Sequence, residues 1–307
     1  MDSPFRKLRR REAHPPAPFV VGVARSGTTL LRMMLDAHPQ LTIPPETHFI
    51  PKLIKVCEEA GEDARERSFE LLTTHRRWPD FGLDPDELRA AFDQLDPFTA
   101  GDALRAFYAA YAARQGKPRW GDKSPGYVRR MRRIQSALPE ARFVHLIRDG
   151  RDVALSQLDV HHGADSVREA AEDWAEGIGK ARRSARRVEH YMEATYEDLV
   201  ADPQPVLRRV CEFVELPYDG AMLSYHEHAE ERMAETVRDF DRRGGTAIPA
   251  ELRARQHSRV SSPPQTQRAG RWRTDMDPGD LQEFESVAGE LLAELGYELG
   301  LPPGGGR

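Results

Sequence analysis

The sequence predicts an α/β fold built around a parallel central sheet. Short runs rich in β-branched and other apolar residues alternate along the chain with longer segments of helical periodicity, as they do in strand–helix–strand units. The 307 residues are 39% hydrophobic and 31% charged, an ordinary composition for a globular protein with a sizeable core. No internal repeat breaks this alternation.

The first strand is expected at residues 19–23, which read Phe-Val-Val-Gly-Val. A helix then starts near Thr28 and carries apolar residues on several sides, as a helix packed on a sheet does. His38 and Pro39 end this helix, because the residue before a proline disfavours the helical conformation. A second short strand is predicted at residues 41–43.

The middle of the chain continues the alternation of strands and helices. Residues 52–118 are mainly helical and amphipathic. A core strand is predicted at residues 142–147, and a helix follows it from about Asp152. A long charged helix is expected over residues 166–190. Residues 220–270 are polar and irregular with helical pieces, a composition typical of a lid.

The last strand of the sheet is expected near residues 192–196. It leads into a helix that Asp202 caps and Pro203 opens, since aspartate accepts hydrogen bonds from the first N–H groups of a helix and proline fits its first turn. A final amphipathic helix is predicted over residues 278–295.

Charge and composition restrict the class of protein. The net charge of −5 excludes a basic nucleic-acid binder, and no apolar run approaches the roughly 20 residues of a membrane helix. Residues 1–17 are basic without a following apolar stretch, so we expect a disordered arm and a cytoplasmic location. The basic run at 182–187 is interpreted as a solvated helix face. One domain is predicted over residues 18–298, with a flexible tail over 299–307.

A phosphate-binding loop is predicted between the first strand and its helix. Residues 22–29 read Gly-Val-Ala-Arg-Ser-Gly-Thr-Thr, and their position directs backbone N–H groups and the helix N-terminus at an anion. Arg25 adds a fork of donors, and Ser26, Thr28 and Thr29 add hydroxyls. The alternative is a plain glycine turn, which needs no such set of donors.

The loop resembles that of nucleoside triphosphatases only in part. The spacing of Gly22 and Gly27 matches their G-x-x-x-x-G-K-[ST] pattern, but Thr28 stands where the pattern has its lysine. Without that lysine, the β- and γ-phosphates beside Mg²⁺ lose their main cation. We therefore predict a loop that binds a phosphate but not a standard nucleoside triphosphate.

A second group of candidate anion ligands follows the strand at 142–147. Arg148 stands at its carboxyl end, where ligands bind in open α/β sheets, and Ser156 lies in the next helix. The motifs R-S-G-T-T-x-L from Arg25 and R-D-G-R-x-x-x-x-S from Arg148 resemble those of the sulfotransferases that use 3′-phosphoadenosine-5′-phosphosulfate (PAPS). The resemblance implies that the first motif binds the 5′-phosphosulfate, and that Arg148 and Ser156 bind the 3′-phosphate.

The resemblance extends into the C-terminal half of the chain. Tyr196, in Tyr-Glu-Asp-Leu, resembles an adenine contact, and Gly270, Arg271 and Trp272 resemble a loop that closes over the nucleotide. The family implies a three-layer P-loop-like fold with a central parallel sheet flanked by helices. It also implies PAPS as co-substrate, release of adenosine 3′,5′-bisphosphate and no metal requirement.

Sulfuryl transfer needs a base for the acceptor proton and a cation for the leaving oxygen. We interpret Glu46 as the base, because its Glu-Thr pair is similar in placement to the catalytic glutamate of tyrosylprotein sulfotransferases and related bacterial enzymes. His48 is the alternative base, since many cytosolic members use a histidine, although from a different motif. Lys123, one of six lysines, is the candidate cation, because related enzymes carry a similar G-x-K-[ST]-P segment. The structural alternatives are that Glu46 is a surface carboxylate and that Lys123 is a solvent-exposed loop lysine.

The acceptor is left open by the sequence. Residues 52–118 and 220–265 are expected to form helical acceptor-side and lid segments, and Phe49, Trp78 and Phe81 fit a small molecule, sugar, lipid, phenol or peptide. A homodimer is a further open alternative. The rival functions are a small-molecule kinase on the same scaffold, and a nucleotide-binding module that would need neither base nor cation.

Overall fold

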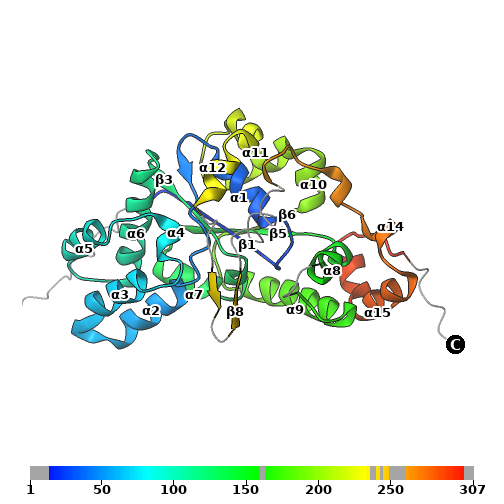
Figure 1. Ribbon diagram of the computed structural model, residues 1–307, viewed down its shortest axis with the longest axis horizontal. Coiled ribbons are helices and arrows are strands. Elements are labelled where there is room, and N and C mark those ends of the chain that lie inside the picture. Colours follow the sequence, from blue (N-terminus) through cyan, green and yellow to red (C-terminus); the bar gives the residue numbers. More distant parts are fainter. Residues whose placement is uncertain (1–13, 160–162, 236–239, 243–244, 249–259, 301–307) are drawn as a thin grey trace, which may run out of the picture.

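A computed structural model gives the fold of the chain. A central sheet carries helices on both faces (Figure 1), so the predicted three-layer α/β fold is confirmed. The four strands of this sheet are all parallel, and their spatial order is β4 (Asp122–Lys123), β1 (Ala17–Gly22), β5 (Ala141–Ile147) and β6 (Tyr191–Thr195). The structure describes residues 14–159, 163–235, 240–242, 245–248 and 260–300.

The other elements connect and follow these strands. Between β1 and β4 lie α1 (Thr28–Asp36), β2 (Leu41–Thr42), α2 (Ile50–Glu59), η1 (Gly61–Asp63), α3 (Ala64–Thr73), α4 (Trp78–Phe81), α5 (Pro85–Asp93), α6 (Ala100–Arg114) and β3 (Arg119–Trp120). Between β4 and β6 lie η2 (Pro125–Arg129), α7 (Met131–Ala137), α8 (Gly150–Leu158) and α9 (Val167–Ala185). After β6 come α10 (Tyr196–Ala201), α11 (Pro203–Phe213), η3 (Gly220–Glu227), α12 (Ala229–Ala234), β7 (Phe240–Arg242), β8 (Gly245–Ile248), η5 (Thr266–Arg268), α14 (Trp272–Asp275) and α15 (Pro278–Glu294).

β1 lies in the middle of the sheet, and all of its residues are buried. It pairs with β5 along its whole length, and its Val20 lies opposite Lys123 of β4. A parallel strand that is buried on both faces reads as an almost continuous apolar run, which is why this strand is visible in the sequence. The pairing brings the carboxyl ends of β1, β4 and β5 to one edge of the sheet.

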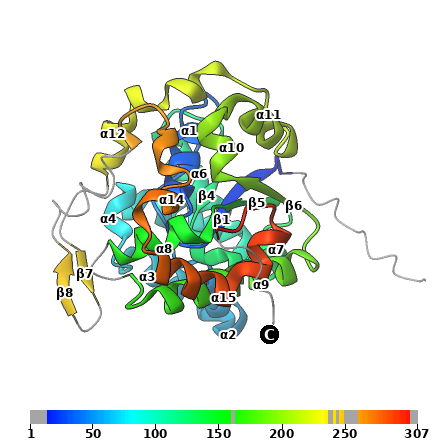
Figure 2. The same cartoon turned by 90° about the vertical axis from the view of Figure 1, so that its right-hand side faces the viewer.

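Side chains of the strands alternate between the two faces and so build separate cores. Val20 and Val144 contribute to a core with α1, α10 and α11, whereas Phe19 and Phe143 contribute to a core with α2, α6 and α7. A third cluster, around Trp174, joins α8, α9 and α15. Figure 1 and Figure 2 show α1, α10 and α11 above the sheet and α7, α9 and α15 below it, while the β7–β8 hairpin projects to one side.

The structure corrects two predicted boundaries and one predicted helix cap. β1 begins at Ala17, two residues earlier than predicted, so the domain starts within the predicted arm. Tyr196 is not the last residue of a strand, because the Thr195 side chain accepts a hydrogen bond from the N–H of Asp198 and so starts α10. Asp202 precedes α11 as predicted, but no described backbone N–H donates to its side chain.

The predicted C-terminal tail begins with two residues that make described contacts. Leu299 packs against the cluster around Trp174, and the backbone N–H of Gly300 donates to Glu285 at 2.8 Å. The first two residues of the predicted tail therefore contact the domain, and its flexibility stays a prediction. The remainder of both predicted termini lies outside the described residues, at 1–13 and 301–307.

The segment at 52–118 is helical as predicted, but Phe49, just before it, and Trp78 and Phe81, within it, do not form an acceptor surface. Phe49, Phe81 and Phe107 are buried and form edge-to-face ring pairs with centroids 5.0 to 6.0 Å apart. Trp78 lies in the same core. The expectation that Phe49, Trp78 and Phe81 contact an acceptor is therefore wrong, because they pack on one another instead.

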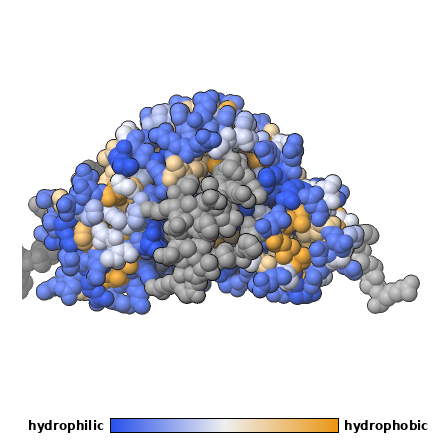
Figure 3. Space-filling view, in the orientation of Figure 1, coloured by the Kyte–Doolittle hydropathy of each residue, from blue (hydrophilic) through white to orange (hydrophobic). Residues whose placement is uncertain are grey.

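The outer surface is largely polar. Figure 3 shows a mainly hydrophilic face with smaller hydrophobic areas toward both ends of the long axis. Apolar side chains gather instead in the three interior clusters. Within the described ranges, no helix combines the length and the apolar character that crossing a membrane requires.

Candidate functional site

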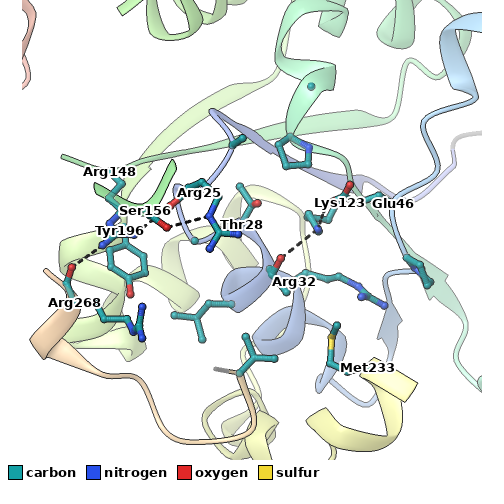
Figure 4. Close-up of a pocket in the computed structure, with 18 of the residues that line it drawn as sticks. Arg25, Thr28, Arg32, Glu46, Lys123, Arg148, Ser156, Tyr196, Met233 and Arg268 are labelled. Atoms are coloured by element: carbon teal, nitrogen blue, oxygen red, sulfur yellow. Dashed lines mark hydrogen bonds and ion pairs between the residues drawn. The ribbon is translucent and has the colours of Figure 1, made fainter. Parts of the chain in front are cut away.

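A cavity of about 480 Å³ lies at the carboxyl ends of β1 and β5 (Figure 4), the edge where parallel sheets bind ligands. Figure 4 shows Arg148, Ser156 and Tyr196 on one side of the phosphate loop, which we call the nucleotide end. Glu46 and Lys123 lie on the other side, which we call the reaction end. The predicted residues that line the cavity are Arg25, Gly27, Thr28, Thr29, Glu46, His48, Lys123, Arg148, Ser156 and Tyr196.

The phosphate loop turns sharply at Gly27. Its φ of 89° lies in the left-handed region that favours glycine, and a Cβ at this position would stand 2.4 Å from the ring of Tyr196. Tyr196 therefore packs directly on the loop. α1 starts at Thr28, which places the N–H groups of its first turn and the positive end of the helix dipole at the cavity.

Ser26 lies behind the cavity wall. It is fully buried, and its backbone N–H donates to the carbonyl of Val23 at 3.2 Å, which closes the turn of the loop. The structure thus gives Ser26 a place in the loop without bringing its side chain to the wall of the cavity. A contact between its hydroxyl and a nucleotide stays a prediction.

Predicted anion ligands from both motifs meet at the nucleotide end. Arg25 Nε donates to Ser156 Oγ at 3.0 Å, and Arg148 Nη1 donates to the carbonyl of Arg25 at 3.2 Å. The guanidinium carbon of Arg148 lies 4.5 Å from the ring centroid of Tyr196. Two guanidinium groups, a hydroxyl and an aromatic ring are thus assembled as a phosphorylated nucleoside requires.

The segment at 270–272 is not part of the described cavity wall. Two of its backbone N–H groups donate to the carboxylate of Asp152, at 2.8 and 2.9 Å. The Trp272 ring is buried against the guanidinium of Arg151, 3.5 Å away. Arg271 forms ion pairs with surface aspartates. A contact between these three residues and the nucleotide stays a prediction.

Three arginines without a sequence prediction line the cavity. The carbonyl of Arg268 accepts a hydrogen bond from Arg148 Nη2 at 2.6 Å, at the nucleotide end. Arg32 is 2% exposed and lies one helical turn after Thr28. Because an arginine is unusual among the apolar residues of this helix, the sequence alone could have indicated it as a candidate site residue. Nothing in the sequence around Arg77 or Arg268 links either residue to the phosphate loop.

Glu46 and Lys123 are in direct contact at the reaction end. Lys123 Nζ lies 2.5 Å from Glu46 Oε1 and 3.4 Å from Thr29 Oγ1, so the pair stands beside the phosphate loop. His48 Nε2 lies 2.8 Å from the second carboxylate oxygen, and Arg77 Nη2 lies 3.7 Å from it. Lys123 is only 3% exposed, which excludes the solvent-exposed lysine considered from the sequence.

A buried polar network holds these residues in place. Lys123 belongs to the short strand β4 rather than to the loop that the sequence predicted. The preceding residue, Asp122, is fully buried and accepts hydrogen bonds from Thr47 Oγ1 and Tyr108 OH, each at 2.8 Å. Because Thr47 adjoins Glu46, the network fixes Glu46 relative to Lys123.

His48 has a left-handed backbone conformation with φ of 55°. This region is uncommon for residues other than glycine, and such conformations persist where the surrounding structure enforces them. In this conformation the imidazole ring reaches back to the carboxylate of Glu46, two residues earlier. The ring therefore restricts the orientation of Glu46.

Neighbouring charges shift the pKa values at the reaction end. Burial raises the pKa of the Glu46 carboxyl, but the Lys123 ammonium, the hydrogen bond with His48 and the charge of Arg77 outweigh it and hold that pKa well below its usual range. Burial lowers the pKa of the Lys123 ammonium, and Glu46 offsets only part of that effect. Glu46 is therefore ionised at neutral pH.

A buried ion pair ties the predicted lid to the phosphate-loop helix. Arg232 of α12 donates to both carboxylate oxygens of Asp36, at the end of α1, at 2.6 and 3.0 Å. The next residue, Met233, lines the cavity, as do Tyr225 and Val260. The lid segment thus borders the cavity where it is described. Its remaining residues, at 236–239, 243–244 and 249–259, lie outside the described residues.

Sequence similarity to known proteins covers most of the chain. Residues 16–220, more than half of it, match the family model described as "Sulfotransferase family". Protein-tyrosine sulfotransferase 1 of Danio rerio is 26% identical over 301 residues, which cover 95% of this chain and 75% of that protein. Protein-tyrosine sulfotransferase of Drosophila melanogaster is 25% identical over 292 residues, 92% of this chain but 52% of the relative, so the chain spans about half of that protein's length.

Solved structures share the fold. The sulfotransferase domain from the Synechococcus PCC 7002 olefin synthase superposes with a TM-score of 0.57 at 26% identity, over 95% of this chain and 98% of that domain. The sulfotransferase domain from the curacin biosynthetic pathway gives 0.59 at 23% identity, over 93% and 99%. The family match favours the predicted sulfotransferase over the kinase and the non-catalytic module. The chain therefore belongs to the sulfotransferase family and is an enzyme of sulfuryl transfer.

Proposed function

We propose that this sulfotransferase transfers the sulfuryl group of PAPS to the phenolic hydroxyl of a tyrosine residue in a polypeptide. The observation that supports this reaction is the direct contact of Glu46 with Lys123 beside the phosphate loop. A base and a cation in adjacent positions can serve the two ends of one in-line displacement. The nucleotide end, with Arg25, Arg148 and Ser156, holds the donor.

Each group at the reaction end has one task. The acceptor oxygen forms a bond to sulfur as the bond between sulfur and the bridging oxygen of the 5′-phosphate breaks. Glu46 takes the proton of the acceptor hydroxyl. Lys123 and Arg25 donate hydrogen bonds to the phosphate oxygens on which negative charge develops. The products are a sulfated acceptor and adenosine 3′,5′-bisphosphate.

The Glu46–Lys123 ion pair couples these tasks. While Lys123 contacts Glu46, the carboxylate is stabilised and is a weak base. A hydrogen bond from Lys123 to the leaving oxygen draws the ammonium away from Glu46, and the burial of the carboxylate then raises its pKa. Glu46 therefore becomes a stronger base at the stage when the leaving oxygen is stabilised. His48 acts as a positioning residue for the carboxylate.

The tyrosine acceptor is supported by the similarity of this chain to protein-tyrosine sulfotransferases, which are 25–26% identical to it over nearly the whole chain. It is tested with purified protein, PAPS and three peptides that differ at one position, which is tyrosine, serine or phenylalanine. Mass spectrometry is expected to find a sulfuryl group on the tyrosine peptide alone. Transfer to the serine peptide or to small alcohols, with none to tyrosine, would overturn the proposed acceptor.

The pH dependence of kcat/KM distinguishes Glu46 from His48 as the base. Because the pKa of Glu46 is lowered, its basic form is lost only as pH falls through that low value, and we expect no acidic limb between about pH 5.5 and 8. On the alkaline side the rate should fall as Lys123, whose pKa burial lowers, loses its proton. An acidic limb within that pH range that disappears in His48→Asn would instead identify His48 as the base.

Arg148→Ala is expected to weaken binding of adenosine 3′,5′-bisphosphate by about 10- to 100-fold, because it removes charge-assisted hydrogen bonds to a phosphate. The rate at saturating PAPS should change little, since Arg148 lies at the nucleotide end. Isothermal titration calorimetry and initial rates measure the two effects. Arg67→Ala, at an exposed position of α3, is the control. Unchanged affinity with a lower kcat would contradict this assignment.

We also propose that transfer needs no metal ion. Arg25, Arg148, Lys123 and the loop N–H groups supply the positive charge that Mg²⁺ and a lysine supply in triphosphatase loops. Initial rates are therefore expected to be the same with and without EDTA. Loss of activity on chelation, with recovery when Mg²⁺ is added back, would show that these groups are insufficient.

A further inference from the structure

Arg32 is a buried arginine in the wall of the cavity. It follows the motif that predicts the phosphate loop, which ends at Leu31, so that motif does not account for it. Its neighbours in α1 are buried apolar side chains such as Leu31 and Met33. Arginine is rarely buried to this extent unless another group pairs with its charge, so the partners of Arg32 need an explanation.

The guanidinium of Arg32 is only partly satisfied within the chain. Its Nε donates to the carbonyl of Ile43 at 2.9 Å, whereas its Nη2 is buried and has no hydrogen-bond partner among the described residues. No described carboxylate lies within ion-pair distance of Arg32, because Asp36, one turn further along α1, pairs with Arg232 instead. A buried charge without a partner costs free energy, and a bound anion would offset that cost.

The position of Arg32 places this charge at the reaction end. Thr28 and Thr29 precede Arg32 by four and three residues, so the three side chains share one face of α1, and all three line the cavity. Lys123 Nζ lies 3.4 Å from Thr29 Oγ1, and Figure 4 shows Arg32 on the same side of the phosphate loop as Lys123. The charge of Arg32 also contributes to the lowered pKa of the Lys123 ammonium, which burial mainly causes.

The anion that belongs at this place is the sulfuryl group of the donor. In the reaction, sulfur moves from the bridging oxygen beside Lys123 to the acceptor oxygen beside Glu46. The other oxygens on sulfur carry negative charge in the donor and take no part in bond making or breaking. The planar fork of a guanidinium matches two oxygens of such a group. The phosphates have other ligands, which are Arg25, Arg148, Ser156 and the loop N–H groups.

We propose that Arg32 binds the sulfuryl group of the donor through two of its non-bridging oxygens and aligns sulfur with the acceptor hydroxyl. The hydrogen bond from Nε to Ile43 fixes the plane of the guanidinium, which leaves the Nη groups for the ligand. Arg32 keeps its protons throughout, so it holds and orients the group that Glu46 and Lys123 act upon. This inference rests on PAPS as the proposed donor.

The test compares two nucleotides that differ only by the sulfuryl group. Isothermal titration calorimetry without acceptor measures the dissociation constants of PAPS and of adenosine 3′,5′-bisphosphate for the wild type and for R32M. We expect R32M to weaken PAPS about tenfold or more and the bisphosphate by no more than about threefold. Equal weakening of both nucleotides, or of neither, overturns the proposal.

The matched control is R65M. Arg65 of α3 is half-buried and donates to a backbone carbonyl, that of Leu95 at 2.6 Å, as Arg32 does to Ile43, but it is not part of the described cavity wall. R65M is expected to leave both dissociation constants unchanged. A loss of PAPS affinity in R65M equal to that in R32M would show that removal of any such arginine has this effect, and would overturn the proposal.

Thermal unfolding separates a ligand-binding role of Arg32 from a structural one. R32M removes a buried charge that has no described carboxylate partner, so the free variant should unfold at a temperature no lower than that of the wild type. Added bisphosphate should raise that temperature in both, because the nucleotide end is intact. A lower unfolding temperature of free R32M, with an unchanged ratio of the two dissociation constants, assigns Arg32 to the fold and overturns the proposal.

Turnover tests the alignment of the sulfuryl group. At saturating PAPS and acceptor, the single-turnover rate of R32M should be about tenfold lower, and KM for the acceptor should not change. A raised KM for the acceptor, with an unchanged ratio of the dissociation constants, assigns Arg32 to the acceptor and overturns the proposal. Failure of the wild type itself to bind PAPS overturns the proposed donor, which distinguishes that result from a failure of Arg32 alone.

Discussion

Glu46→Gln is expected to lower kcat by a factor of about 10² to 10⁴, while the affinity for adenosine 3′,5′-bisphosphate changes little. The amide keeps the shape of the side chain, but it cannot take the proton of the acceptor hydroxyl. The loss should persist at saturating PAPS and acceptor, because it concerns the chemical step and not binding. Initial-rate kinetics and calorimetric titration of the bisphosphate measure the two quantities.

Glu59→Gln is the matched control for this variant. Glu59 is 60% exposed on α2 and is not part of the described cavity wall, so the same chemical change there should leave both quantities unaltered. A normal kcat for Glu46→Gln together with a large loss for His48→Asn would reverse the assignment. His48 would then be the base, and Glu46 would orient it.

Lys123→Ala is expected to lower kcat by a factor of about 10² to 10³. The variant removes a buried ammonium from beside the phosphate loop, where negative charge develops on the leaving oxygen. Nucleotide affinity should fall much less, because Arg148 and Ser156 bind the other end of the donor. Single-turnover rates at saturating PAPS, compared with calorimetric affinity for the bisphosphate, measure this difference.

Lys55→Ala is the control, because Lys55 is 61% exposed and pairs only with Glu59 among the described carboxylates. Lys123 is buried, so its removal can lower the stability of the fold as well as the rate. Thermal unfolding with saturating bisphosphate separates these effects, since an intact nucleotide end still stabilises the folded variant. Equal losses in kcat and in nucleotide affinity would contradict a role for Lys123 in the chemical step.

The first strand, the phosphate loop and α1 could be predicted because their signals are local. A buried parallel strand reads as an apolar run, and the helix begins directly after Gly27. The second anion motif is local in the same way, since Arg148 directly follows β5 and the Asp149 side chain caps α8. The two motifs meet in one cavity because each follows a strand of the same parallel sheet, and the carboxyl ends of these strands lie at one edge.

β4 could not be predicted from its own residues. A strand of two residues has no periodicity, and Asp122 and Lys123 have low strand propensity. They extend the sheet because β1 pairs with them and because Thr47 and Tyr108 donate to the buried carboxylate of Asp122. The contact of Lys123 with Glu46 thus depends on three segments that are distant in sequence.

The C-terminal motif at 270–272 lies outside the described cavity wall, and its contact with the nucleotide stays a prediction. Asp152, inside the second anion motif, accepts two hydrogen bonds from this segment and thereby turns Trp272 into the core. The sequence carries no sign that this carboxylate binds a backbone segment. Arg268, a few residues earlier, reaches the cavity instead.

The most direct test of the Glu46–Lys123 pair is the single-turnover rate of sulfuryl transfer in E46Q, K123A and E46Q/K123A, at saturating PAPS and acceptor. Groups that act together in one transition state have strongly non-additive effects. We predict that the double variant is slower than the slower single variant by no more than about threefold. A double variant whose loss equals the product of the two single losses would show that Glu46 and Lys123 act independently, and would contradict their assignment as one catalytic unit.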